Sequence, residues 1–110
     1  MDRVFKALAD RSRRKLLDQL FAHNGQTLGE LAAHLAMTRQ AASKHLAVLE
    51  EANLVATRWR GREKLHYLNP VPIHAIAERW IGKFARNRLR ALAELKSSLE
   101  EKIDERKPKT

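Results

Sequence analysis

The most constraining feature of this chain is a helical spacing of apolar residues that is interrupted once by a two-residue period. Apolar side chains recur every three or four residues up to about residue 51 and again from Ile73 onward, as in helices that bury one face. Between these regions, 54–60 alternates, Gly61 marks a turn, and 65–68 forms a second short run, which is the pattern of a β-hairpin. The sequence therefore predicts a mainly α-helical fold of order α-α-α-α-β-β-α with one hairpin.

Capping residues bound the expected helices. Side-chain oxygens that can accept from free helical N–H groups occur at Asp10 or Ser12, at Thr27 with Glu30 three residues later, and at Thr38. The expected elements are a short helix that ends near residue 9, helices to about 23 and over 28–36 and 39–51, strands over 54–60 and 65–68, and a long helix over about 72–104, with a kink near 85–88 left open.

Length and composition limit the classes of protein. A chain of 110 residues allows one domain, so we expect residues 1–104 to form a single domain and residues 105–110, which lack an apolar side chain, to be a disordered tail. The absence of cysteine excludes disulfide scaffolds and thiolate metal sites. No nucleophile–base pair, paired acids or glycine-rich phosphate loop is present, so we expect neither an enzyme nor a cofactor. No membrane-spanning run or signal core is evident, and a cytoplasmic protein is expected.

The charge favours an anionic partner. Lysine and arginine number 22 against 13 acidic residues, for a net charge of +9. Such an excess favours nucleic acid first among the possible partners, followed by a membrane surface or an acidic protein. The alternative explanation is that the charge only keeps the protein soluble. The placement of the charges has to decide among them.

The segment 28–51 has the organisation of a helix-turn-helix. A short helix, a turn at residues 36–37 and a second helix are followed directly by the hairpin, which takes the place of a wing. In the second helix the polar residues left over from the apolar stripe lie three to four positions apart, share a face, and carry donors suited to base edges or phosphates. We expect this face to bind double-stranded DNA through Arg39, Gln40, Ser43 and Lys44, with the capping residue Thr38 beside them.

The hairpin carries four basic residues within seven positions. Alternation places Arg58 and Arg60 on one face and Arg62 at the tip, with Lys64 beyond it and Glu63 as the single opposing charge. Basic residues on edge strands also discourage aggregation. An arginine-rich tip, however, is well suited to phosphate or minor-groove contact, so we expect all four to contact DNA.

The last helix has an apolar stripe that needs a cover. Its length would be roughly 50 Å if straight, beyond what a domain of about 13 Å radius of gyration can cover. A symmetric second copy is the simplest cover, with folding back on the same chain and binding at a membrane surface as alternatives. The stripe comprises Trp80, Ile81, Phe84, Leu89, Leu92, Leu95 and Leu99.

The first 70 residues resemble the ArsR family of winged helix-turn-helix repressors. The segments that carry the resemblance are 4–13, 27–32, 42–49 with 54–55, and 61–62. The resemblance implies that Arg39, Gln40, Ser43, Lys44 and His45 contact DNA and that Arg62 contacts phosphate or the minor groove, although packing of His45 beside Leu46 is the alternative. It also implies a homodimer joined through the first and last helices on an inverted-repeat site, which adds Val4, Phe5 and Leu8 to the interface.

The sequence departs from the family pattern at two single positions and at the metal-sensing sites. Arg11 stands where the family usually has proline, and Asn53 where it usually has glycine. Metal-responsive members carry cysteines on the helix matching 28–36, which this chain lacks, or Asp, His and Glu ligands on the last helix, where only His74 and Glu78 form a candidate pair. We therefore expect no bound metal, and the sequence does not identify an inducer.

The sequence as a whole predicts a sequence-specific DNA-binding transcriptional regulator, a homodimeric repressor of an inverted-repeat operator. The alternative is a winged-helix module that binds protein or RNA without operator specificity.

Overall fold

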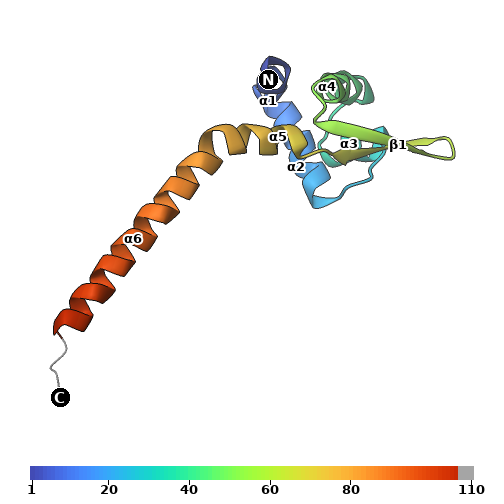
Figure 1. Cartoon of the computed structure of the whole chain (residues 1–110). Helices are drawn as coiled ribbons and strands as arrows, with labels where there is room; N and C mark the ends of the chain where they lie inside the picture. Colours follow the sequence, from blue (N-terminus) through green and yellow to red (C-terminus); the bar gives the residue numbers. More distant parts are fainter. Residues whose placement is uncertain (107–110) are drawn as a thin grey trace. The chain divides into compact units, whose positions relative to one another are not determined.

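The structure is a computed structural model that describes residues 1–106 (Figure 1). The chain divides into two compact units, Met1–Ala75 and Ile76–Thr110. The first unit contains four helices, the hairpin and residues 71–75 of a fifth helix, and the second consists of helical turns that continue to Arg106. Within the described residues, no helix is both long and apolar enough to cross a membrane.

The first unit has four helices before the hairpin, and the last three of them begin where the capping residues predict. They are α1 (Asp2–Leu8), α2 (Arg11–Ala22), α3 (Leu28–His34) and α4 (Arg39–Glu51). The side chain of Asp10 accepts from the backbone N–H of Arg13 at 3.0 Å, and Thr27 and Thr38 cap α3 and α4 in the same way. Of the two caps considered for α2, Asp10 is therefore the one used. Of the expected capping box, the half made by Thr27 is confirmed, because its hydroxyl oxygen accepts from the backbone N–H of Glu30 at 3.2 Å, while the Glu30 carboxylate accepts from the Thr27 hydroxyl at 3.1 Å.

Two left-handed residues shape the connections around α4. Ala36 has φ of 53° in the turn between α3 and α4, and the neighbouring N–H of Met37 donates to the carbonyl of Ala32 at 2.9 Å. Asn53 has φ of 61° after α4, a conformation that asparagine tolerates better than most residues. These turns give the helix-turn-helix its tight connection and direct the chain from α4 into the hairpin.

The hairpin consists of β1 (Val55–Arg60) and β2 (Glu63–Leu68), paired antiparallel. β2 begins two residues earlier than expected, because the register pairs Arg60 with Glu63 across a tight connection at Gly61, whose φ is 62°. An isolated bridge between Gln26 and His66 ties the base of the hairpin to the α2–α3 connection. The base is thus held by the core, while every residue of β1 after Val55 is exposed.

A single apolar core holds α1 to α4 against the hairpin base. Its largest fully buried side chains are Leu16, Leu20, Leu31, Leu49 and Leu54. The expected inner stripe of α4 is confirmed, since Ala42, Leu46 and Leu49 are all buried. Burial of this stripe leaves the opposite face of α4 toward solvent, which is the face that bears the polar residues.

The last helix is continuous in the chain but not regular. It comprises α5 (Val71–Ala77), a π-helical turn η1 (Glu78–Gly82) and α6 (Lys83–Arg106). The irregular turn lies before residues 85–88, which are regular helix within α6. A Cβ at Gly82 would lie 2.9 Å from the Glu78 carboxylate, so glycine leaves room for that side chain to fold over the turn. Of the expected disordered tail, residues 105 and 106 belong to α6, and residues 107–110 lie outside the described residues.

Candidate nucleic-acid interface

The polar residues expected at the start of α4 are all exposed, but they face two different hollows. Gln40 and Lys44 line a shallow depression of about 270 Å³, together with Thr38 and His45. Arg39 and Ser43 line a larger groove of about 430 Å³ on the other side, between α4, the first turn of α3 and β2. The structure therefore keeps the expected residues on one helix end but separates them into two rows.

Arg39 is folded against α3. A Cβ added at Gly29 would lie 3.0 Å from the Arg39 guanidinium nitrogen Nη2, so the missing side chain at Gly29 provides the space in which the guanidinium lies. Gly29 is ten positions away from Arg39 in the sequence and lies on another helix. Gln40 and Lys44, in contrast, lie on the row of α4 that carries no such cover.

Two of the four basic residues of the hairpin are engaged in ion pairs. Lys64 Nζ lies 3.1 Å from Glu50 Oε1 and joins β2 to α4. Arg60 donates to Glu63 at 2.8 Å, and the hydrogen bond and charge of that carboxylate raise the pKa of Arg60. Within residues 1–106, Arg58 and Arg62 have no carboxylate partner. The uncompensated positive charge of the hairpin therefore sits on Arg58 and on Arg62 at the tip.

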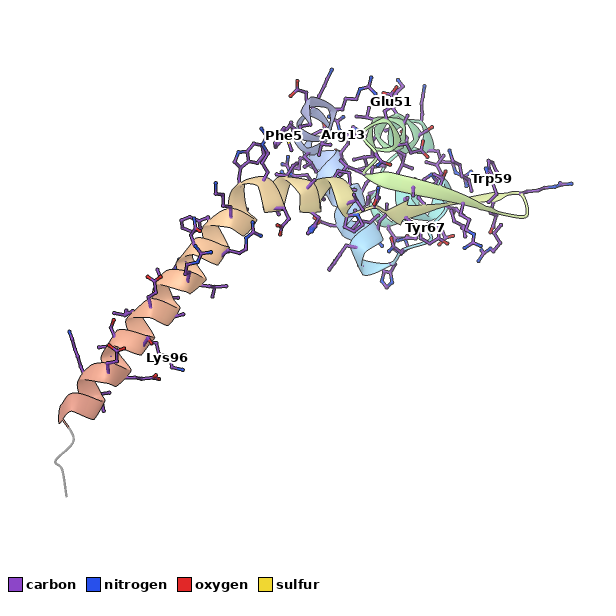
Figure 2. The ribbon with its side chains drawn as sticks, viewed as in Figure 1. Phe5, Arg13, Glu51, Trp59, Tyr67 and Lys96 are labelled. Carbon is purple, nitrogen blue, oxygen red and sulfur yellow. The ribbon has the colours of Figure 1, made fainter. Side chains whose placement is uncertain are left out.

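A junction that the sequence did not predict joins α4 to α1 and α2. Arg13 donates through Nε to the carbonyl of Ala7 at 2.8 Å and through Nη2 to the carbonyl of Lys6 at 3.0 Å, which satisfies the end of α1. Its Nη1 lies 3.5 Å from His45 Nδ1. Figure 2 shows Arg13 near the point where α1, α2 and α4 come together.

His45 belongs to this junction and also reaches the surface. Its Nδ1 lies 4.0 Å from Asp10 Oδ1, and its side chain is 24% exposed. The backbone N–H of Arg13, together with the charges of Arg13 and His45, lowers the pKa of Asp10. The ring of His45 therefore packs against the start of α2, and it also lines the depression beside Lys44.

A buried polar pair supports the base of the hairpin. His66 is buried, and its Nδ1 lies 2.9 Å from the carbonyl oxygen of Gln26, which is also buried. Gln26 Nε2 in turn donates to the carbonyl of His23 at 2.6 Å. A histidine in an alternating strand carries no signal of such a role, because its partner is 40 residues away.

The residues expected at a dimer interface differ in exposure. Val4 is 8% exposed and packs in the core of its own unit, which leaves little of it for a second copy, whereas Phe5 is about half exposed. The seven stripe residues of η1 and α6 are all exposed, at 51–66%.

Glu78 of the candidate metal pair is engaged by an arginine. The Glu78 carboxylate accepts from Arg86 at 3.0 Å, and His74 is exposed. No group of three metal-ligating side chains occurs in the part of the chain that the structure describes.

Comparisons with known proteins agree with this geometry. A helix-turn-helix domain family matches residues 8–58. The chain is 35% identical over 69 residues to the transcriptional repressor SdpR of Bacillus subtilis, covering 63% of this chain and 76% of SdpR. The structure of an ArsR-like transcriptional regulator from Rhodococcus sp. RHA1 superimposes with a TM-score of 0.69 and 31% identity, covering 91% of this chain and 90% of that one. A homodimeric winged helix-turn-helix DNA-binding domain from Mycobacterium bovis gives a TM-score of 0.61 and 26% identity, with 87% and 82% covered.

Proposed function

Because the chain belongs to the ArsR family of winged helix-turn-helix transcriptional regulators, we propose that it acts as a homodimeric repressor of an inverted-repeat operator. The observation that carries this proposal is the arrangement of the first unit, in which the exposed donors of α4 are followed by a hairpin with unpaired arginines. A helix enters the major groove of DNA with its first turns, and a basic wing reaches the flanking backbone or minor groove.

The two rows of α4 support different roles. Gln40 can make a bidentate contact with adenine, and Lys44 beside it suits a phosphate. Arg39 reaches DNA by leaving the space over Gly29, and Ser43 lies one turn further along the same groove. We therefore assign base recognition mainly to Gln40. Arg39 and Ser43 lie on the side of α4 that faces the hairpin.

The arginines of the hairpin suit electrostatic contact. Arg58 and Arg62 bring charge that no carboxylate within residues 1–106 neutralises, so each can release counterions on meeting a phosphate. Lys64 and Arg60 are already paired with glutamates, and we assign them the role of stabilising the conformation of the hairpin.

Dimerisation is supported by exposed apolar surface. Seven large apolar side chains of the second unit lie along one helix, and each is worth about 1.5–3 kcal/mol when buried. A contiguous surface of this kind on a small protein is typical of an interaction site. The homodimeric state of the Mycobacterium bovis domain points the same way. In the proposed arrangement the first unit binds DNA and the last helix, with Phe5 and Leu8, joins two copies.

Repression is supported by the relative. SdpR, with 35% identity, is a transcriptional repressor. A dimer that covers two half-sites in a promoter would block access by the transcription machinery.

The test is binding to the promoter of its own operon. In a gel shift at moderate salt, we expect that promoter to be bound more tightly than random duplex of the same length, and footprinting to show two protected half-sites. Equal affinity for both duplexes would overturn operator recognition. Equal affinity for RNA and duplex DNA would favour the non-operator winged-helix module.

A further inference from the structure

Gly29 is a glycine that the backbone of α3 does not require. It is the second residue of the helix, and it lacks the positive φ that Gly25 and Gly61 have. Glycine is less favourable in a helix than alanine, because it loses more conformational freedom on folding. What glycine provides at this position is therefore space.

The guanidinium of Arg39 fills that space. From a Cβ built at Gly29, Nη2 would lie 3.0 Å away, Cζ 3.4 Å and Nε 3.8 Å, so the whole group lies over the glycine. The shortest of these separations is below an ordinary van der Waals contact of about 3.5–4.0 Å. A side chain at position 29 would therefore displace the guanidinium, which is the far end of a flexible side chain and moves without strain in the backbone.

No polar contact holds Arg39 in this position. Within residues 1–106, its guanidinium makes neither a hydrogen bond nor an ion pair. Gly29 belongs to the first turn of α3, where free N–H groups carry partial positive charge that disfavours a nearby cation. Arg39 is therefore held over Gly29 by packing alone and can leave at small cost.

We propose that Gly29 is a positioning residue that allows Arg39 to retract from DNA. The inference rests on the proposed function and adds a determinant of affinity that lies outside α4. With glycine at position 29, the guanidinium is distributed between the retracted position and extended positions that reach DNA. A side chain there removes the retracted position, so that Arg39 extends from the first turn of α4, which the proposed complex places in the major groove.

The size of the effect follows from the retracted fraction. The apparent affinity of a protein is reduced in proportion to the fraction that is competent to bind. With Arg39 retracted in about half of the free molecules, blocking retraction strengthens each half-site about twofold and a dimer on two half-sites about fourfold.

A double-mutant cycle between positions 29 and 39 tests the proposal. We would measure operator affinity by fluorescence anisotropy for the wild type, Gly29→Ala, Gly29→Ser, Arg39→Ala and the double variant G29A/R39A. We expect both single variants of Gly29 to bind about fourfold more tightly than the wild type, and G29A/R39A to bind no more tightly than Arg39→Ala. Serine is the matched control for helix stability, because it adds a Cβ but has a lower helix propensity than alanine.

The other outcomes would overturn the proposal. Equal tightening by Gly29→Ala with and without Arg39, or tightening by alanine and not by serine, would show that the substitution acts through the stability of α3. Unchanged or weaker binding of both Gly29 variants, with urea unfolding showing that they are folded, would mean that the space over Gly29 does not hold Arg39 away from DNA. These results would leave the proposed function standing, whereas equal affinity of the wild type for operator and random duplex would refute that function and the inference with it.

Discussion

The ion pairs of the hairpin lead to different expectations for two neighbouring cations. Arg62 is at the tip and has no carboxylate partner within residues 1–106, whereas Lys64 Nζ lies 3.1 Å from Glu50. In the proposed complex with DNA, replacing Arg62 with alanine would remove one phosphate contact from each wing, so a dimer would lose about two contacts. Lys64→Ala removes a cation that is already neutralised by α4, and it should cost mainly a surface ion pair, about 0–1 kcal/mol of stability.

The salt dependence of binding measures this difference. The slope of log K against log salt is about −0.9 for each phosphate neutralised, so Arg62→Ala should reduce its magnitude by about 1.8 for the dimer. Between 0.05 and 0.2 M salt, this corresponds to a difference of about 12-fold in the loss of affinity. Fluorescence anisotropy with an operator duplex over that range would give the slopes of the wild type, Arg62→Ala and Lys64→Ala.

We expect Arg62→Ala to lower the slope on operator and random duplex alike, and Lys64→Ala to keep the wild-type slope. Equal changes in the two variants would refute the reasoning, because they would show that the Glu50 pair does not withhold Lys64 from DNA. An unchanged slope for Arg62→Ala would refute the assignment of the tip to phosphate contact.

Three further predictions follow from other residues of the first unit. Gln40→Ala should reduce discrimination between operator and single-base variants by about 1–3 kcal/mol while keeping the salt slope, as measured by competition binding; reduced binding to all sequences alike would contradict base readout. Arg13→Ala should lower the free energy of unfolding in urea by about 1–3 kcal/mol, because it removes the donors that satisfy the end of α1; wild-type stability would contradict the junction. The pKa of Asp10 is lower in the folded protein than the ordinary value of 3.8. The contribution of this carboxylate to the free energy of unfolding is therefore fully present above pH 3.8 and is lost as the pH falls through the lower pKa of the folded state. Asp10→Asn should therefore flatten the acid limb of the stability profile, and an unchanged limb would contradict the cap.

The local structure of this protein follows from short-range chemistry. Asp10, Thr27 and Thr38 each bond a backbone N–H three residues ahead, so the starts of three helices depend on adjacent sequence. The buried stripe of α4 follows from apolar spacing in the same way. These signals were sufficient to predict the order of helices and hairpin, the helix-turn-helix and the polar face of its second helix.

The start of the second strand and the position of the irregular turn in the last helix could not be predicted from adjacent sequence. β2 begins at Glu63 because it pairs with Arg60, a contact made across the turn and not within the strand. The irregular turn lies at Glu78–Gly82 and not at 85–88, since the Glu78 side chain occupies the space that Gly82 leaves open. In both cases the deciding contact is between side chains or strands that the spacing of apolar residues does not report.

Sequence alone determined which residues of this protein are polar, basic and exposed on α4 and the hairpin, because exposure follows from the periodicity of a helix or strand. Only the tertiary structure decided which of those charges are free. Glu50 neutralises Lys64 from another element, Gly29 makes room for Arg39, and Arg13 meets His45 across 32 positions of sequence. Free charge depends on the distance to the nearest opposite charge, and that distance exists only once α2, α3, α4 and β2 have packed together.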